Sequence, residues 1–324
     1  TMGDPAGCGP AITAAAWRQL RADPGLAFYV IGAPELYAPG VPVREIAAPD
    51  EARGAFADAL PVLALSDVPD IRPGEPNADA APAIIRSIAL ATSHALDGLA
   101  GGIVTNPINK ALLYGAGFAY PGHTEYVAHL CAEPHAKPPR PVMMLVGGGL
   151  RVALATIHMP LMDVAKALTV PGLVELGHIV AQAMTRDFGI PAPRLAFSGL
   201  NPHAGEDGTI GRQEIDIINP AAHALRLAGI DISDARPGDT VFAEALSGRF
   251  DAVIAMTHDQ GLIPVKTLDF WGGVNVTLGL PVVRTSPDHG TAYDAAAAGT
   301  TRPDSLIAAL RLAAAMAQAR SQTT

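Results

Sequence analysis

Three histidines stand directly after apolar runs that are typical of buried β-strands. His158 follows Val-Ala-Leu-Ala-Thr-Ile, His203 follows Leu-Ala-Phe-Ser-Gly-Leu-Asn-Pro, and His258 follows Ala-Val-Ile-Ala-Met-Thr. The carboxyl ends of the strands in an open parallel sheet face the ligand crevice, so imidazoles placed there can converge on one ion. A site of three histidines leaves a fourth position vacant, which distinguishes catalytic from structural zinc. The pattern therefore predicts a divalent metal held by these three side chains.

A single histidine after a strand is as often a packed core or capping residue, and that alternative stands for each of the three taken alone. Their shared position favours the metal, and so do their neighbours. Asn201 and Glu206 flank His203, and Asp259 directly follows His258. A carboxylate beside a metal-bound imidazole commonly fixes the tautomer and orientation of the ring.

A second polar group lies in the segment Tyr-Pro-Gly-His-Thr-Glu at residues 120–125. It places an imidazole, a hydroxyl and a carboxylate in consecutive positions, at His123, Thr124 and Glu125. One interpretation is ligand binding. The other is that Thr124 caps a helix that begins near Tyr126.

Lys266, Asn275 and Arg284 interrupt strongly apolar surroundings at regular intervals. A buried cation usually needs an anionic partner. Phosphate fits, because arginine offers a bidentate fork and lysine a point charge. The alternative is a buried ion pair with Asp269 or Asp288.

The glycines of the opening segment, residues 1–10, match neither the dinucleotide-binding fingerprint nor the P-loop, and the chain contains no nucleophile elbow. A dinucleotide, if bound, is therefore held in another way, and covalent hydrolysis is disfavoured.

Composition excludes several classes of protein. The chain has 324 residues, is 49% hydrophobic and carries a formal net charge of -9, which disfavours nucleic-acid and anionic-membrane partners. Cys8 and Cys131 are too few for a disulfide framework, which favours a cytoplasmic location. We expect neither a membrane span nor a signal peptide.

Strand-like and helix-like stretches alternate along the chain, which predicts an α/β protein with helices covering a mostly parallel sheet. A hairpin through the three glycines at 147–149 predicts one antiparallel pair and hence a mixed sheet. Residues 40–80 carry the weakest patterning, and we expect a variable surface region there. Helices are predicted over 83–99, 171–188, 214–227 and 305–319, and strands over 102–105, 141–146, 150–157, 251–257, 274–278 and 282–285, with a further strand ending at residue 200.

Six blocks, spread over the whole chain, resemble the 4-hydroxythreonine-4-phosphate dehydrogenases of pyridoxal phosphate biosynthesis. The blocks are Gly-Asp-Pro-Ala-Gly-Cys-Gly-Pro at 3–10, Val-Thr-Asn-Pro-Ile-Asn-Lys at 104–110, Pro-Gly-His-Thr-Glu at 121–125, Leu-Asn-Pro-His-Ala-Gly-Glu at 200–206, His-Asp-Gln-Gly-Leu-Ile-Pro-Val-Lys at 258–266, and Arg-Thr-Ser-Pro-Asp-His-Gly-Thr-Ala at 284–292. In that family a β-strand precedes the first block.

The resemblance implies an α/β/α fold like that of isocitrate and isopropylmalate dehydrogenases, with two subdomains and a cleft between them. We expect one subdomain to comprise residues 1–122 and 265–324, and the other, residues 123–264, to carry the dimer contacts and the metal-ligand strands. The resemblance also implies a homodimer whose active site lies at the interface, with one metal ligand donated by the partner subunit.

The resemblance assigns site residues by motif and leaves the cofactor-binding residues unknown. It implies metal ligands at His158, His203 and His258, substrate contacts at His123, Thr124, Lys266, Asn275 and Arg284, and acidic residues that maintain the site at Asp239 and Asp259.

The implied reaction is the metal-dependent oxidation of 4-phosphooxy-L-threonine by NAD or NADP. The product, 2-amino-3-oxo-4-phosphooxybutanoate, then loses CO2 to give 3-amino-2-oxopropyl phosphate. Zinc is favoured as the metal, with magnesium, manganese and cobalt as alternatives. The competing functions are a sister dehydrogenase of 4-phosphothreonate or 4-phosphoerythronate, a dihydrodiol dehydrogenase, a zinc hydrolase and, most remotely, a metal-storage or scaffold protein.

Overall fold

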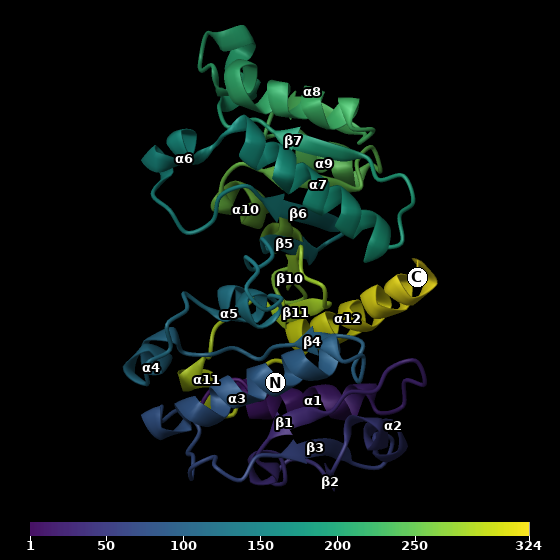
Figure 1. Ribbon diagram of the computed structural model, residues 1–324. Helices are drawn as coiled ribbons and strands as arrows, with labels where there is room; N and C mark the ends of the chain where they lie inside the picture. Colours follow the sequence, from purple (N-terminus) through teal and green to yellow (C-terminus); the bar gives the residue numbers. More distant parts are fainter. Residues whose placement is uncertain (324) are drawn as a thin grey trace. The chain divides into compact units, whose positions relative to one another are not determined.

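The computed structural model describes residues 1–323, which form two compact units. Unit 1 comprises Thr1–Pro141 and Leu280–Gln318, and unit 2 comprises Val142–Gly279 with the residues from Ala319 onward. Figure 1 draws unit 1 mainly in purple, blue and yellow, and unit 2 mainly in teal and green.

Unit 1 contains parallel strands with helices around them. Strands β1, β3 and β2 form a parallel sheet in that order, and β4 pairs in parallel with β11. Its elements are α1 (Gly9–Leu20), β1 (Val30–Gly32), η1 (Pro34–Leu36), β2 (Val43–Ile46), η2 (Pro49–Glu51), α2 (Ala52–Ala55), β3 (Leu60–Ala64), η3 (Ala78–Ala80), α3 (Ala81–Leu96), β4 (Ile103–Val104), α4 (Lys110–Gly115), α5 (His123–Leu130), β11 (Arg284–Pro287), α11 (Tyr293–Ala298) and most of α12 (Asp304–Thr323).

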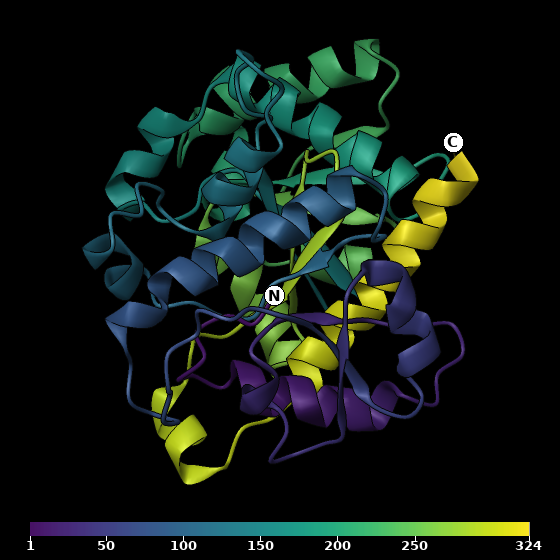
Figure 2. The same cartoon turned by 60° about the horizontal axis from the view of Figure 1, so that its bottom comes forward.

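One hydrophobic core of unit 1 forms between α1, β3 and the first half of α12. Pro10 stands in the first turn of α1, where a missing N–H breaks no helical hydrogen bond. Trp17 and Leu20 of α1 are buried in the same cluster as Leu310 of α12. Figure 2 shows α1 in purple beside the yellow α12. The indole Nε1 of Trp17 donates to the carbonyl of Phe56 at 2.8 Å, so its one polar group is satisfied.

Residues 40–80, expected to form a variable surface region, contribute two strands of the unit 1 sheet, so that prediction was wrong. β3 is the central strand, and its Leu60 and Val62 are fully buried. Pro61 lies inside β3 and weakens the strand signal, because proline cannot donate to the hydrogen-bond ladder.

Unit 2 is built on a mixed sheet in the strand order β10-β5-β6-β9-β7-β8. The pairs β10–β5 and β5–β6 are antiparallel, and β6–β9, β9–β7 and β7–β8 are parallel. Gly148 and Gly149 adopt positive φ between β5 and β6, so the predicted hairpin and mixed sheet are confirmed. Its elements are β5 (Val142–Gly147), β6 (Leu150–Leu154), α6 (Leu161–Ala167), α7 (Val170–Arg186), β7 (Leu195–Ser198), η4 (Pro202–Gly208), the π-helical turn η5 (Glu214–Ile218), α8 (Asn219–Leu227), β8 (Ile232–Arg236), α9 (Val241–Leu246), β9 (Ala252–Ala255), α10 (His258–Leu268) and β10 (Val274–Leu278).

Helices α7 and α8 pack closely against each other (Figure 1). Thr169 caps α7 by accepting a hydrogen bond from the backbone N–H of Gly172 at 3.2 Å. Gly177 allows this close approach, because a Cβ there would lie 2.4 Å from a methyl group of Leu225 and the leucine would have to shift. Within the part of the chain that the structure describes, no single helix is long and apolar enough to cross a membrane. Only α6 and α7 taken together pass that test, across a bend of 91°.

The two units differ in their boundaries from the expected subdomains. Residues 123–141 group with unit 1, because α5 packs on α3 and its Tyr126 and Val127 share a core with Ile84 and Ile88. Residues 265–279 group with unit 2, because β10 pairs with β5. The last residue of the expected range, residue 324, lies outside the described residues.

A buried carboxylate joins the end of α7 to the end of α12 within unit 2. Asp187 is 1% exposed. Arg186 donates to it from Nε at 2.7 Å and Nη2 at 3.1 Å, and Arg320 donates from Nε at 2.6 Å and Nη2 at 3.2 Å. Two bidentate arginines compensate the cost of burying the charge.

We expect Asp187→Ala to lower the free energy of unfolding by about 3 kcal/mol, because both guanidinium groups lose their shared partner. Urea denaturation followed by circular dichroism measures the change. The control is Asp58→Ala at an exposed carboxylate, where we expect a change below about 0.5 kcal/mol. Equal effects of the two substitutions would contradict a stabilising role for Asp187.

Candidate active site

The three predicted metal ligands follow strands that lie side by side in unit 2. β6 pairs in parallel with β9, and β9 pairs in parallel with β7. Because parallel neighbours end at the same edge of a sheet, the segments that carry His158, His258 and His203 leave from one edge. The rings of His158 and His258 lie 5.5 Å apart, measured between their centroids.

His258 is the first residue of α10, and local hydrogen bonds fix its position. The preceding Thr257 is the N-cap, and its hydroxyl accepts from the backbone N–H of Gln260 at 3.3 Å. The Nδ1 atom of His258 lies 2.9 Å from a carboxylate oxygen of Asp259. This contact leaves Nε2 as the nitrogen available to an ion.

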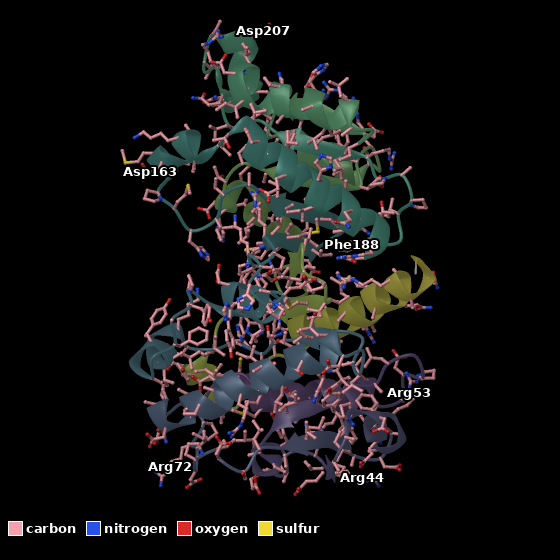
Figure 3. All side chains as sticks on the ribbon, in the orientation of Figure 1. Arg44, Arg53, Arg72, Asp163, Phe188 and Asp207 are labelled. Atoms are coloured by element: carbon pink, nitrogen blue, oxygen red, sulfur yellow. The ribbon has the colours of Figure 1, made fainter. Side chains whose placement is uncertain are left out.

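His203 lies in a left-handed turn, which the sequence did not predict. Residues 203–207 all have positive φ, between 43° and 82°. Figure 3 labels Asp207, the last of them. The Nδ1 atom of His203 lies 2.6 Å from a carboxylate oxygen of Glu206, and this hydrogen bond raises the pKa of His203. Nε2 is again the nitrogen left for an ion.

The left-handed turn is strained. A non-glycine residue in this conformation costs about 1–2 kcal/mol, because its Cβ approaches the following carbonyl oxygen. Only Gly205 of the five residues escapes that cost. Strain of this kind persists where surrounding contacts impose it, and it concentrates at functional sites.

The described residues of one chain contain no group of three metal-binding side chains placed to hold an ion. The rings of His158 and His258 are neighbours, and the hydrogen-bond partner of His203 is Glu206. The donor chemistry nevertheless suits a divalent ion, since two of the three imidazoles have a carboxylate on Nδ1. That one ligand comes from a partner subunit stays a prediction.

A cavity of about 340 Å³ adjoins His203. Asp239 and Gln260 line it together with Asn201. Its carboxylate, amide and imidazole groups provide donors and acceptors for a polar ligand. A cavity of about 410 Å³ in unit 1 is lined by none of the predicted site residues. The volume of a cavity therefore does not identify the candidate active site.

A second group of functional side chains lies in unit 1. Arg284 is 3% exposed, and its Nη2 donates to the hydroxyl of Thr105 at 2.7 Å. Burial lowers the pKa of Arg284 to about 10, against the opposing effect of Glu125, so the guanidinium stays charged near neutral pH. Burial, and then the charge of Arg284, hold the pKa of His123 well below its usual value. Its Nε2 is covered and has no hydrogen-bond partner among the described residues.

The capping interpretation of Thr124 is wrong. Helix α5 begins at His123, its N-cap is Gly122, and no side chain caps it. Lys110 crosses over Gly122, where a Cβ would lie 3.0 Å from the Lys110 Cε. No role was predicted for Lys110 or Thr105 by residue. Both lie in the block at 104–110 that carried the resemblance, and this was the signal that could have identified them. Glu125 was predicted only as one member of the polar group at 123–125.

Lys266 and Asn275 belong to unit 2, whereas Arg284 belongs to unit 1. The ammonium of Lys266 lies 5.6 Å from the centre of the Phe270 ring. Asn275 lies in β10 opposite Leu145 of β5. Its amide oxygen is buried and accepts no hydrogen bond from the described residues, so it can accept one from a ligand.

Proteins with sequences similar to this chain carry the name dehydrogenase. A 4-hydroxythreonine-4-phosphate dehydrogenase of Caulobacter vibrioides is 54% identical over 99% of this chain and 97% of that protein. The chain is therefore an α/β protein of the dehydrogenase class. The profile of the pyridoxal phosphate biosynthetic protein PdxA matches residues 27–313, and the chain belongs to this family.

Solved structures agree with the fold. The 4-hydroxythreonine-4-phosphate dehydrogenase of Klebsiella pneumoniae superposes with a TM-score of 0.84 at 39% identity, and 98% of each chain is covered. A terephthalate 1,2-cis-dihydrodiol dehydrogenase of Burkholderia xenovorans gives 0.65 at 27% identity, covering 97% of this chain and 96% of the other. The predicted α/β class and the predicted resemblance are confirmed.

The lowered pKa of His123 makes the stability of the protein depend on pH. Above the unfolded-state pKa of about 6.5 the ring is neutral in both states. Below it, the unfolded chain binds a proton that folded His123 does not, so stability falls as pH falls. Between pH 7 and 5 we expect wild type to lose up to about 1.4 kcal/mol per pH unit more than His123→Gln does. Denaturation at stepped pH measures this difference, and parallel profiles would contradict a buried neutral imidazole.

Proposed function

We propose that this protein catalyses the oxidation of 4-hydroxythreonine 4-phosphate at its C3 hydroxyl, with a nicotinamide dinucleotide as hydride acceptor. Membership of the family over nearly the whole chain is the observation that carries the proposal. The ketone product, a 2-amino-3-oxo acid, then loses CO2 to give 3-amino-2-oxopropyl phosphate. The product is a small phosphorylated amino ketone for pyridoxal phosphate synthesis.

His158, His203 and His258 are the residues that we propose to hold a divalent ion, with one of them supplied by the partner subunit of a homodimer. When bound, the ion supplies Lewis acidity at the substrate oxygen, in oxidation and in decarboxylation. Glu206 and Asp259 orient two of the imidazoles through Nδ1. Asp239, beside His203 in the same cavity, adds negative charge near the ligand nitrogens. We favour zinc, because imidazole nitrogens suit it.

The anionic phosphate and carboxylate of the substrate need cationic partners, and in this acidic chain those partners are individual lysine and arginine side chains. Arg284 offers a guanidinium fork that is charged near neutral pH and held by Thr105, and Lys110 adds an ammonium near His123. In this proposal Arg284, Lys266 and Asn275 bind the phosphate and carboxylate ends. His123 stays neutral near pH 7, so it can exchange a proton with a substrate hydroxyl, and Thr124 beside it donates or accepts a hydrogen bond.

The nicotinamide cofactor accepts the hydride, and the protein orients the substrate carbon toward it. The chain lacks the glycine fingerprint of dinucleotide-binding folds, so we assign no residue to this cofactor. NAD is our first choice, and NADP is the alternative. A cytoplasmic location stays a prediction.

The decisive experiment is an assay of nicotinamide reduction with Zn²⁺ present. 4-Hydroxythreonine 4-phosphate, 4-phosphothreonate and 4-phosphoerythronate are compared as substrates, each with NAD and with NADP. We expect kcat/KM to be highest with the first, because it carries the amino group at C2. His203→Ala should lower kcat/KM by at least about 100-fold while the protein stays folded.

Other outcomes identify the competing functions. Faster turnover of a C2-hydroxy substrate would assign the chain to the sister dehydrogenases. Release of phosphate without nicotinamide reduction would assign it to zinc hydrolases. Full activity of His203→Ala with metal retained would remove the ligand assignment.

A further inference from the structure

A buried carboxylate lies behind the left-handed turn of His203. Glu214 is 2% exposed, although it is the first residue of the π-helical turn η5. Its Oε1 accepts from the backbone N–H groups of Leu200 and Asn201, each at 2.8 Å. Its Oε2 accepts from Nδ2 of Asn201 at 2.9 Å. Glu214 therefore binds the chain just before the turn begins.

The same carboxylate sits against the turn itself. A Cβ on Gly205 would lie 2.8 Å from Oε2 of Glu214, and a Cβ on Gly199 would lie 3.3 Å from Oε1. Gly199 also lies under Ala204, whose Cα would be 2.9 Å from such a Cβ. Glycines at 199 and 205 thus allow the turn to close directly over Glu214.

The π-helical geometry of η5 is part of this arrangement. Single π-helical turns are rare and frequently occur at functional sites. Gln213, the N-cap of η5, accepts from Nδ2 of Asn201 at 2.7 Å. The start of η5 therefore holds Asn201 through two side chains.

The strand before the turn has its own support. Gln260 accepts from the hydroxyl of Ser198 at 2.8 Å and from the N–H of Met256 at 2.9 Å, and it donates to the carbonyl of Gly199 at 2.8 Å. The end of β7 is thereby tied to the end of β9. Loss of Glu214 should loosen the turn without releasing the strand.

We propose that Glu214 is a positioning residue, which holds the strained turn of residues 203–207 so that His203 presents Nε2 to the metal ion. The inference rests on the proposed role of His203 as a metal ligand. Glu214 does not contact the ion. It acts through Leu200, Asn201 and Gly205.

The test uses Glu214→Gln in the full-length protein, with Co²⁺ alone as the probe. Glutamine keeps the shape, but its amide nitrogen replaces an acceptor that faces Nδ2 of Asn201, and the charge that strengthens the other bonds is lost. We expect the Kd for Co²⁺, read from visible absorption, to rise by about tenfold or more. The matched control is Asp216→Asn, which removes the same charge from the exposed side of η5 and should change the Kd less than about twofold.

Relief of strain provides a rescue that a purely structural role would not give. Glycine adopts left-handed φ without steric cost, so Ala204→Gly in the Glu214→Gln background should recover about threefold in Co²⁺ affinity. Thermal unfolding of each variant checks that the chain is folded. If Glu214→Gln does not fold, Asn201→Ala, which removes only the bonds of that side chain, should weaken Co²⁺ binding in the same direction.

Two comparisons separate the inference from the proposed function. Undiminished Co²⁺ binding and absorption by His203→Ala would reject the ligand assignment itself. The role of Glu214 would be overturned by a normal Co²⁺ affinity in Glu214→Gln combined with weak binding by His203→Ala, and the ligand assignment would then still stand. If Glu214→Gln is unfolded, a normal Co²⁺ affinity in Asn201→Ala has the same meaning. Failure of Ala204→Gly to restore any affinity would also count against it.

Discussion

The parallel pairing of β6, β9 and β7 is the constraint on which the candidate metal site depends. Parallel strands that are neighbours in a sheet end at one edge, so segments distant in sequence leave the sheet together. A change of direction in any one of the three strands would remove its histidine from this edge. β6 is also antiparallel to β5, and an antiparallel pair can be joined by a short hairpin. The three parallel strands β6, β9 and β7 need longer crossover connections.

Strand ends expose backbone groups that need partners, and in unit 2 a half-buried glutamine and a buried glutamate provide them. Gln260 and Glu214 serve this purpose at the ends of β7 and β9. The same bonds set the course of the chain into the following segments. Stability and site geometry are therefore provided by the same residues, which explains how a strained turn can persist there.

Unit 1 uses burial differently. Arg284 stays charged because its pKa falls only to about 10, whereas burial keeps His123 neutral near pH 7. One low-dielectric environment thus produces a fixed cation and a neutral imidazole, from groups whose usual pKa values lie far apart. The cation suits an anionic group of a ligand, and the neutral imidazole suits a hydroxyl group with which it can exchange a proton.

The sequence alone determined the α/β class, the hairpin, the family and the strands that precede the histidines, because apolar periodicity and short motifs are local properties. It failed for residues 40–80, where Pro61 obscured a central strand, and for Thr124, whose helix begins earlier than its pattern suggested. Only the tertiary structure revealed the left-handed turn of His203, the burial of Glu214 and the separation of Arg284 from Lys266 and Asn275 into different units. The turn and the burial of Glu214 depend on how residues 199–206 pack against the start of η5, and the division into units depends on contacts between segments far apart in the chain. Local sequence preference does not encode either kind of packing.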